Sequence, residues 1–445
     1  MRQNPSNSES SAPLNLVIPT GGGILDDGTL IELVENPSQP HAPALLKFDG
    51  HEPEIRSQIE HDGRLYVPLL IPPTVRRALR LPTGCAPDGP TTQLFTRLLN
   101  VFENFTDLAE YPRISTVSFL FASWIPDLLP VPVTLFLWAP DPVAGVRVLT
   151  VLSSLCRLAL GLSGADARDL RVLPDDLPAT LLLFRPPSTR RSLEALGALG
   201  WPGFPNCRRG RLVATVGAKA IVSDTPLPDG TALGPMFVAH VATSRRPLPL
   251  LDKKTLEALA KEFLPQLLRF RLQRCTTAVG EKSTQTYSAT PPNSLITALE
   301  ICFRNEPALT DAVSPLIEAA QNGHEPGGAD PRVPLLEVVR ARCHEPGRER
   351  LYVGEITLDL NAKTTAGGGK VELAERMVGG LLRSLGLATR KLDRRGADSC
   401  WMPPPGSGFI AWRTSSTRPQ PGRHFRVVRN VRRRNRLQRR KLRMW

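Results

Sequence analysis

The sequence lacks the residue patterns that mark metal sites, disulfide frameworks and secretion. Its seven cysteines lie far apart, and no CxxC pair or Cys/His cluster has the spacing of a zinc site. The N-terminal segment MRQNPSNSESSAPLN contains no apolar stretch of the kind found in signal peptides. None of the seven histidines has neighbours that suggest a Ser/His/Asp or Cys/His catalytic group. We therefore expect a cytoplasmic protein without a resident metal or cofactor, and we assign no catalytic residue.

An uninterrupted apolar segment long enough to cross a membrane is also missing. Residues 117–138 have the length, but Pro126, Asp127, Pro130 and Pro132 interrupt them. This pattern predicts a helix, a turn and a buried strand, and it argues against a membrane partner. No internal repeat is present either. With 445 residues, 44 of them proline, the chain is expected to form several domains built from short elements.

Basic charge is unevenly distributed along the chain. The formal net charge is +14, from 56 Lys and Arg against 42 Asp and Glu. Thirteen of the basic residues and no acidic residue lie between Arg413 and Trp445, which leaves 43 basic against 42 acidic residues elsewhere. Only this C-terminal tail therefore points directly to a polyanionic partner.

Composition and periodicity divide the chain into five segments. The polar N-terminus precedes short apolar runs separated by Gly, Pro and Asp, and the pattern turns helical from Thr91. The predicted segments are the polar N-terminus with a small β-rich domain (1–92), an α/β domain (93–250), a helical region (251–345), a winged-helix-like domain (346–412) and an Arg-rich disordered tail (413–445).

The α/β domain alternates between apolar runs and helical stretches. VTLFLW (133–138) and ATLLLF (179–184) are short and continuously apolar, as expected for strands buried on both faces of a parallel sheet. The helical run VRVLTVLSSLCRLAL follows the first, so that residues 133–160 are predicted to form a strand, a loop and a helix. The fold class is therefore α/β, with a mainly parallel sheet over residues 133–248 and helices on both faces.

The loop after VTLFLW stands in the register of a phosphate-binding loop, GxxxxGK[ST]. Such a loop needs glycines so that backbone N–H groups approach phosphate, a lysine to neutralise it and a hydroxyl to hold magnesium. Here Ala139 and Ala144 replace the glycines, Gly145 replaces the lysine and Val146 replaces the hydroxyl residue. Every position that carries chemistry is changed.

The second apolar strand lacks the acidic end that nucleotide hydrolysis requires. Catalytic NTPases place a carboxylate there to hold the metal ion, whereas ATLLLF ends in Phe184 and Arg185. Asp175 and Asp176 precede this strand, at its other end, and do not substitute for the missing carboxylate.

The order of these blocks resembles the helicase-type P-loop ATPases associated with phage and plasmid primases and with bacterial mobile elements. The resemblance covers roughly residues 93–412 and rests on SFLFASWIPDLLPVPVTLFLWAP, VLTVLSSLCR, ATLLLF, VGAKAIVS and ATSRRPLPL. It implies a P-loop NTPase-like fold, whereas the altered positions imply an inactive relative. It also implies a sensor position at Lys219, an inter-subunit arginine site at Arg245 and Arg246, and a homo-oligomer or a helicase or primase partner.

The segment after the helical region is similar to the winged-helix domain that follows the ATPase in these relatives. Two short helices precede an alternating piece, and the candidate recognition helix runs from Val371 to Leu385 with Glu372 and Glu375 outward. Gly379 and Gly380 are expected to permit close packing on a neighbour. DNA contact and a structural or protein-binding role both fit this segment. The basic residues expected to meet phosphates are Arg376, Arg383, Arg390, Lys391, Arg394 and Arg395.

The tail is the strongest functional signal, and arginine predominates in it. Guanidinium groups pair with phosphates in a planar fork and stack on bases, so we expect the tail to bind nucleic acid, DNA in preference to RNA. A solubilising end without a selected role is the alternative. The expected contacts are Arg426, Arg429, Arg432, Arg433, Arg434, Arg436, Arg439, Arg440, Lys441 and Arg443.

Three functions are compatible with the sequence alone. The preferred one is a catalytically inactive, helicase-like P-loop protein that binds nucleic acid in an accessory or regulatory role. The others are a protein-interaction scaffold with an incidental basic tail and an enzyme of an unrecognised class.

Overall fold

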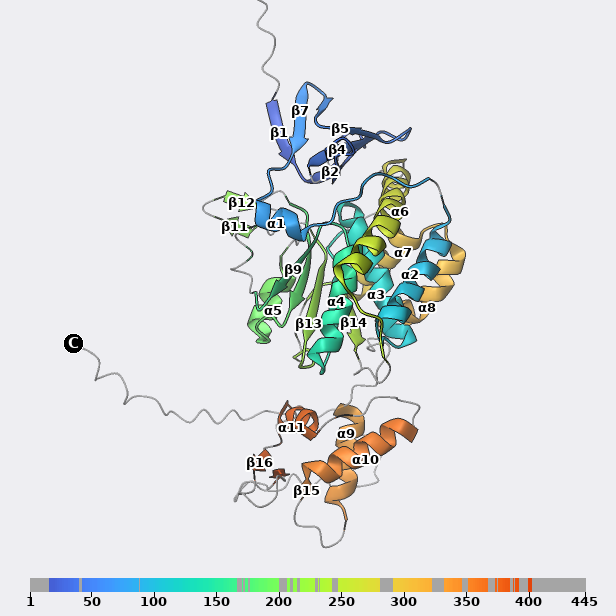
Figure 1. The fold of residues 1–445 in the computed structure, drawn as a ribbon. Coiled ribbons are helices and arrows are strands. Elements are labelled where there is room, and N and C mark those ends of the chain that lie inside the picture. The colour runs from blue at the N-terminus through green and yellow to red at the C-terminus, as the bar shows by residue number, and fades with distance from the viewer. Residues whose placement is uncertain are drawn as a thin grey trace, which may run out of the picture. The chain divides into compact units, whose positions relative to one another are not determined.

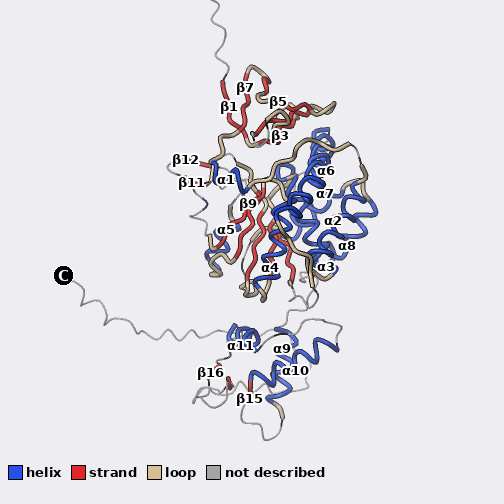
Figure 2. Tube along the Cα trace, viewed as in Figure 1, coloured by secondary structure: helices blue, strands red, loops and turns tan. Residues whose placement is uncertain are grey.

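Figure 1 shows the computed structural model of the protein, and Figure 2 colours the same view by secondary structure. A parallel five-stranded sheet with helices follows a small β-rich part. The structure describes residues 16–39, 42–87, 89–165, 170, 173–174, 177–199, 206–208, 211–213, 217–228, 231, 233–241, 247–280, 291–321, 332–345, 351–366, 373, 375–384, 387, 389–391 and 399–401.

Two small sheets form the β-rich N-terminal part, as predicted. β2, β3, β4 and β5 make an antiparallel sheet in that order. β1, β7 and β6 make a second sheet, in which β1 runs parallel to β7. Gly28 and Gly63 have positive φ angles of 92° and 68°, which glycine adopts without strain in turns. The strands are β1 (Leu16–Thr20), β2 (Gly22–Ile24), β3 (Leu30–Glu35), β4 (Pro43–Phe48), β5 (Glu54–Arg56), β6 (Ile59–His61) and β7 (Arg64–Pro68).

All five strands of the central sheet are parallel, in the order β14, β8, β13, β10, β9. The two continuously apolar runs form β8 and β10, which confirms the prediction of buried parallel strands. β13 lies between them. Their continuous hydrophobicity is required because both faces of this sheet are covered. The strands are β8 (Thr134–Trp138), β9 (Ala159–Ser163), β10 (Thr180–Phe184), β13 (Lys219–Ser223) and β14 (Met236–His240).

The helix predicted to extend to residue 160 ends five residues earlier. α4 spans Pro142–Leu155, and Ala159–Ser163 forms the edge strand β9 instead. Between the two elements Leu158 has a φ of 46°, a strained conformation for a branched side chain. The preceding residue, Arg157, binds a buried carboxylate on β3. The prediction was wrong because the sequence stays apolar from α4 into β9 and so contains no local signal for the end of the helix. The contact that accompanies this end is the ion pair between Arg157 and Glu32, which lies far away in the chain.

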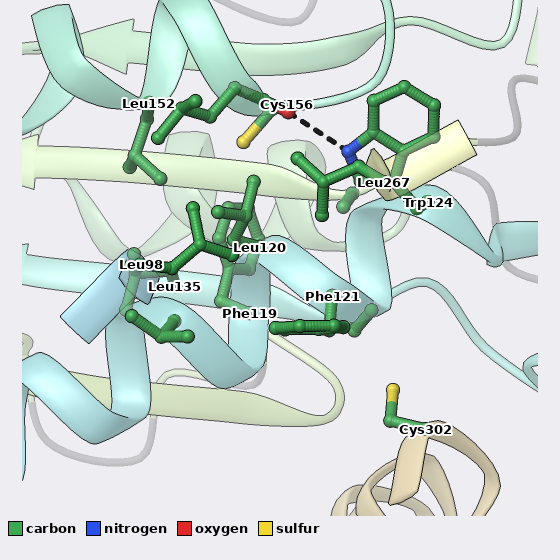
Figure 3. Packing of buried hydrophobic residues seen from close by; sticks show 14 of the residues in the cluster. Leu98, Phe119, Leu120, Phe121, Trp124, Leu135, Leu152, Cys156, Leu267 and Cys302 are labelled. Atoms are coloured by element: carbon green, nitrogen blue, oxygen red, sulfur yellow. Dashed lines mark hydrogen bonds between the residues drawn. The ribbon is translucent and has the colours of Figure 1, made fainter. Parts of the chain in front are cut away.

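Helices cover one face of the central sheet (Figure 1). Buried side chains of α2, α3, α4, α6, α7 and α8 share a hydrophobic core with strand residues such as Leu135. Figure 3 shows Trp124 of α3 beside Leu267 of α6, and the Trp124 indole donates a hydrogen bond to Leu155 O at 2.9 Å. The helices are α2 (Thr91–Phe105), α3 (Glu110–Trp124), α4 (Pro142–Leu155), α6 (Lys253–Gly280), α7 (Pro291–Phe303) and α8 (Pro307–Gln321).

The apolar segment at 117–138 folds as the sequence predicts. It contains the end of α3, a single 3-10 turn at Pro126–Leu128 and the strand β8. Across the described ranges, no helix combines the length and the hydrophobicity that a membrane crossing needs.

Strand residues on the second face of the sheet share a core with Leu193 and Leu196 of α5 and with Ile31 and Leu33 of β3. The remaining elements here are α1 (Pro73–Ala78), α5 (Arg190–Gly197) and the antiparallel pair β11 (Asn206–Arg208) and β12 (Arg211–Val213).

Three buried charged side chains, Glu32, Arg157 and Arg271, meet the partly exposed Asp127 where β3 contacts the helical layer. Glu32 accepts hydrogen bonds from Arg157 Nε and Nη2, each at 2.9 Å, and from Arg271 Nε at 2.8 Å. Arg271 also donates to Trp124 O at 2.8 Å and to Asp127. Both guanidinium groups are at most 1% exposed. Because two cations face two carboxylates, the cluster is electrically balanced.

The C-terminal described segment has its own small hydrophobic core. Leu373, Val378, Leu381 and Leu382 are buried in it, and Glu375 is exposed, as predicted. β15, β17 and β16 form an antiparallel sheet. The elements are α9 (Arg332–Cys343), β15 (Leu351–Tyr352), α10 (Val353–Ala366), α11 (Glu375–Ser384), β16 (Thr389–Lys391) and β17 (Ser399–Trp401).

Candidate functional site

The carboxyl ends of β8, β13 and β10 meet at one edge of the central sheet. Trp138 pairs in register with Ser223, and Val222 pairs with Phe184. The ladder continues beyond the strands, because Ala139 N–H donates to Ser223 O at 2.8 Å and Arg185 N–H donates to Val222 O at 2.9 Å. This edge is where parallel α/β sheets bind ligands. The altered loop and the altered acidic strand therefore lie together here.

The connection between β8 and α4 is shorter than predicted. The loop was expected to extend from Ala139 to Gly145, but only residues 139–141 separate the strand from the helix. Asp141 is the N-cap residue and Pro142 is the first helical residue, a combination that starts a helix at once. Ala144, Gly145 and Val146 therefore lie within α4 and not in a loop.

The N–H groups that would approach a phosphate already have partners within the chain. Val143 N–H donates to Asp141 Oδ1 at 2.9 Å, and Gly145 N–H donates to Asp141 O at 3.2 Å. Pro140 and Pro142 have no N–H to offer. The Asp141 carboxylate occupies the position at the helix N-terminus that favours an anion, so it competes with any phosphate there.

Gly145 has a packing role that explains its identity. A Cβ atom at this position would lie 2.6 Å from Val222 Cγ1 and 2.8 Å from Ala139 Cβ. The first turn of α4 therefore packs directly on the end of β13. A lysine at residue 145 would require the helix or the strand to move. Val143 and Val146 turn outward and are 67% and 40% exposed.

The end of β10 carries a cation in place of a carboxylate. Arg185 has a φ of 48°, and its Nη2 lies 2.6 Å from Asp224 Oδ2, with both side chains half-exposed. Its guanidinium also lies 5.7 Å from the centre of the Phe184 ring. Sequence reasoning missed Asp224, which directly follows β13. The signal was an acidic residue immediately after VGAKAIVS.

Lys219 lies at the opposite end of β13 from this site. It pairs in register with Thr134 and Leu181 at the amino ends of β8 and β10, so a role as sensor at the carboxyl edge does not fit. Lys219 is also buried, not solvated, and its Nζ has no hydrogen-bond partner within the described residues. Burial lowers the pKa of this amine to about 8. The polar residue at the carboxyl end of β13 is Ser223.

An aromatic pair extends the edge to β14. The rings of Trp138 and His240 are in contact, with centroids 4.6 Å apart and a tilt of 52° between their planes. Burial lowers the pKa of His240 to about 4, so the imidazole is neutral at pH 7. Neither the Trp138 indole nitrogen nor His240 Nε2 has a hydrogen-bond partner in the described parts of the chain. Among those same residues, no group of three or more potential ligands is arranged to hold a metal ion.

The other predicted site residues cannot be placed in this geometry. Arg245, Arg246, Arg394, Arg395 and the whole tail lie outside the described residues. The remaining four belong to described elements, but their side chains lie outside the description: Arg376 and Arg383 on α11, and Arg390 and Lys391 on β16.

Comparison with known proteins gives no family for the chain. No protein-family model matches it, and no curated protein matches it. An apo structure of the NrS-1 C-terminal region is 10% identical, with a TM-score of 0.29, covering 84% of this chain and 96% of that one. A structure of Drosophila ORC bound to DNA is 10% identical, with a TM-score of 0.16, covering 71% and 91% of the two chains. Similarities this weak carry no argument.

Proposed function

We propose that the protein is a nucleotide-independent relative of helicase-type P-loop ATPases that binds nucleic acid through a C-terminal winged helix and an Arg-rich tail. Its role is accessory or regulatory, beside a helicase or primase, and DNA is preferred over RNA. The concentration of thirteen basic residues and no acidic residue between Arg413 and Trp445 is the observation that carries the proposal.

The carboxyl edge of the sheet supports the loss of nucleotide chemistry. Phosphoryl transfer depends on a lysine, a magnesium-holding hydroxyl and a carboxylate that face one phosphate. The corresponding positions hold Gly145, Val146 and Arg185. In addition, the Asp141 carboxylate caps α4 and repels an approaching phosphate. These features support the proposal that the edge no longer carries out nucleotide chemistry.

The first test is a titration of the full chain with magnesium and ATP. We expect neither hydrolysis nor binding with micromolar affinity, because the loop offers a carboxylate where the nucleotide needs N–H donors. Isothermal calorimetry measures the binding. Tight, magnesium-dependent binding would show that the closed loop opens and would refute this part of the proposal.

The C-terminal elements support a winged helix. α9, β15, α10, α11 and the pair β16 and β17 follow one another along the chain, and the strands close into one antiparallel sheet. Helices followed by a hairpin are the order of elements in winged helix-turn-helix modules. Arg390 and Lys391 lie on β16, a strand of that hairpin, where basic side chains can reach a phosphate backbone.

The second test removes the tail. The full chain and a chain ending at Trp412 are titrated with the same duplex and single strand at 50 and 200 mM salt. If six to ten arginines meet phosphates, affinity of the full chain falls about 10³ to 10⁵-fold between these concentrations. The shortened chain should bind weakly and with a shallower salt slope. Equal affinities and slopes would place the binding surface in the body of the protein.

A protein-interaction scaffold is the second candidate. The observation that favours it is the exposure of Val143 and Val146 on the first turn of α4, where an NTPase presents polar residues to its nucleotide. In that case Val143→Asp would abolish partner binding while leaving nucleic-acid affinity unchanged.

A further inference from the structure

One edge of the N-terminal sheet formed by β1, β7 and β6 is open. Among the described elements β1 pairs with β7 alone, and no labelled strand lies on its other side (Figure 1). Leu16 and Val17 on β1 are 63% and 53% exposed, and Leu70, which follows β7, is 90% exposed. A sheet edge with exposed apolar side chains is a template for pairing with another strand. β1 is therefore a candidate docking surface.

The backbone of β1 directs the N–H and C=O groups of Val17 at this open edge. Leu69 N–H donates to Thr20 O at 2.9 Å, so the Thr20 carbonyl faces β7. Successive residues of a strand direct their N–H and C=O groups to opposite sides, which places those of Val17 and Pro19 on the open side. Because proline has no N–H, Val17 offers the complete donor and acceptor pair on this edge of β1.

β1 carries no charged side chain, in contrast to two other edge strands of the β-rich part. Its sequence is LVIPT. β5 exposes Glu54 and Arg56, and β6 exposes Glu60 beside His61. Charged side chains on an edge strand discourage pairing, because two copies bring like charges together. Two copies of β1 meet without such repulsion, so this edge is compatible with a second copy of the chain.

We propose that β1 pairs antiparallel with β1 of a second copy of this chain, with the two-fold axis at Val17. In this register the two Val17 residues exchange both N–H···O bonds, and their side chains lie opposite each other. Leu16 then lies opposite Ile18 of the second copy, which covers its exposed side chain. A register with Val17 opposite Pro19 is less favourable, because each Val17 carbonyl would face a nitrogen without a hydrogen. Two three-stranded sheets thereby form one continuous sheet across the dimer.

Sedimentation equilibrium of the full chain, freed of nucleic acid, tests this pairing. Since the contact involves two five-residue strands, we expect a monomer–dimer equilibrium with a dissociation constant of about 1 to 100 μM. Val17→Lys and Val17→Asp each place like charges on the two-fold axis, so each variant alone should dimerise about tenfold more weakly. An equimolar mixture of the two should dimerise more strongly than either variant alone, because Lys then faces Asp.

The mixture also controls for misfolding. Val17 is exposed, so neither substitution should unfold the chain, and recovery in the mixture requires both variants to be folded. Leu250→Lys is the matched control, since Leu250 is 76% exposed but lies outside the β-rich part, and it should leave the dimer unchanged.

Two results would overturn the proposal. A wild type that stays monomeric at about 100 μM would leave the β1 edge to other residues of the chain or to another protein. Dimerisation that is equal in the wild type and Val17→Lys, or a mixture that is no stronger than its components, would place the contact between copies elsewhere.

Discussion

Replacement of Glu32 by methionine should be among the most destabilising single changes in the protein. Glu32 is buried and accepts three hydrogen bonds from two guanidinium groups that are themselves at most 1% exposed. Without it, Arg271 keeps its ion pair with Asp127, but Arg157 loses the one ion pair that it makes within the described residues. Removal of one partner from a buried ion pair costs about 3 to 5 kcal/mol, because a charge is left buried without compensation.

The estimate converts into a measurable shift in melting temperature. A loss of about 4 kcal/mol corresponds to roughly 8 to 16 °C for a domain of this size class. Glu35→Gln on the same strand is the control. Its carboxylate lies 3.4 Å from Arg76 Nη2 in a partly exposed pair, so its loss should cost less than about 1 kcal/mol.

A double variant separates buried charge from lost packing. Glu32→Met combined with Arg157→Met restores charge balance, because Arg271 and Asp127 remain as a pair. Replacement of buried ion pairs by apolar residues is often nearly neutral, so the double variant should be more stable than Glu32→Met alone. If Glu32→Met costs no more than Glu35→Gln, or if the double variant is the less stable one, the reasoning about this cluster is refuted.

Two further predictions concern Lys219 and the helical glycines. The folded-state pKa of Lys219, about 8, lies below its ordinary value of 10.5, so the unfolded chain binds more protons between these pH values and wild-type stability should rise across that window. Lys219→Met should therefore raise the free energy of unfolding by about 3 kcal/mol at pH 7 and abolish its rise with pH. Denaturation with urea at pH 7 and pH 10 measures both effects. An unchanged free energy of unfolding would contradict the cost assigned to the burial of this amine. Gly145→Ala should destabilise the protein by about 1 to 3 kcal/mol, because the new methyl group would clash with Val222 and Ala139. Gly380→Ala in α11 is the matched control. Its methyl group would meet nothing within 4 Å, so this variant should stabilise the protein by up to about 1 kcal/mol. The same sign for both glycine variants in thermal melts would refute the packing argument.

The predicted glycine role in α11 illustrates where sequence reasoning was too specific. Gly379 and Gly380 were expected to permit close packing. A Cβ on Gly379 would meet only Val353 Cγ1, at 3.9 Å, which is ordinary contact, and one on Gly380 would meet nothing. Gly145 does require close approach, and the sequence analysis interpreted it only as a replaced lysine.

Several features followed from the sequence because their causes are local. Continuous apolar runs produced β8 and β10, since a strand buried on both faces needs no polar residue along its length. The prolines at 117–138 ended α3 and started the turn before β8, because proline cannot continue a helix. The charge of the tail is likewise a property of its composition alone.

The tertiary structure decided the features that depend on residues far apart in the chain. The pairing of Arg157 with Glu32, 125 residues away, accompanies the end of α4 and the start of β9, although the hydrophobic run continues through the break. The register of β13 between β8 and β10 placed Lys219 at the amino edge of the sheet and brought Arg185 to Asp224 at the carboxyl edge. The sequence determined which segments are strands, helices and charged tail, because propensity and hydrophobicity act over a few residues. Only the assembled sheet decided which ends meet, because that depends on strand order and on buried charges that find their partners across the fold.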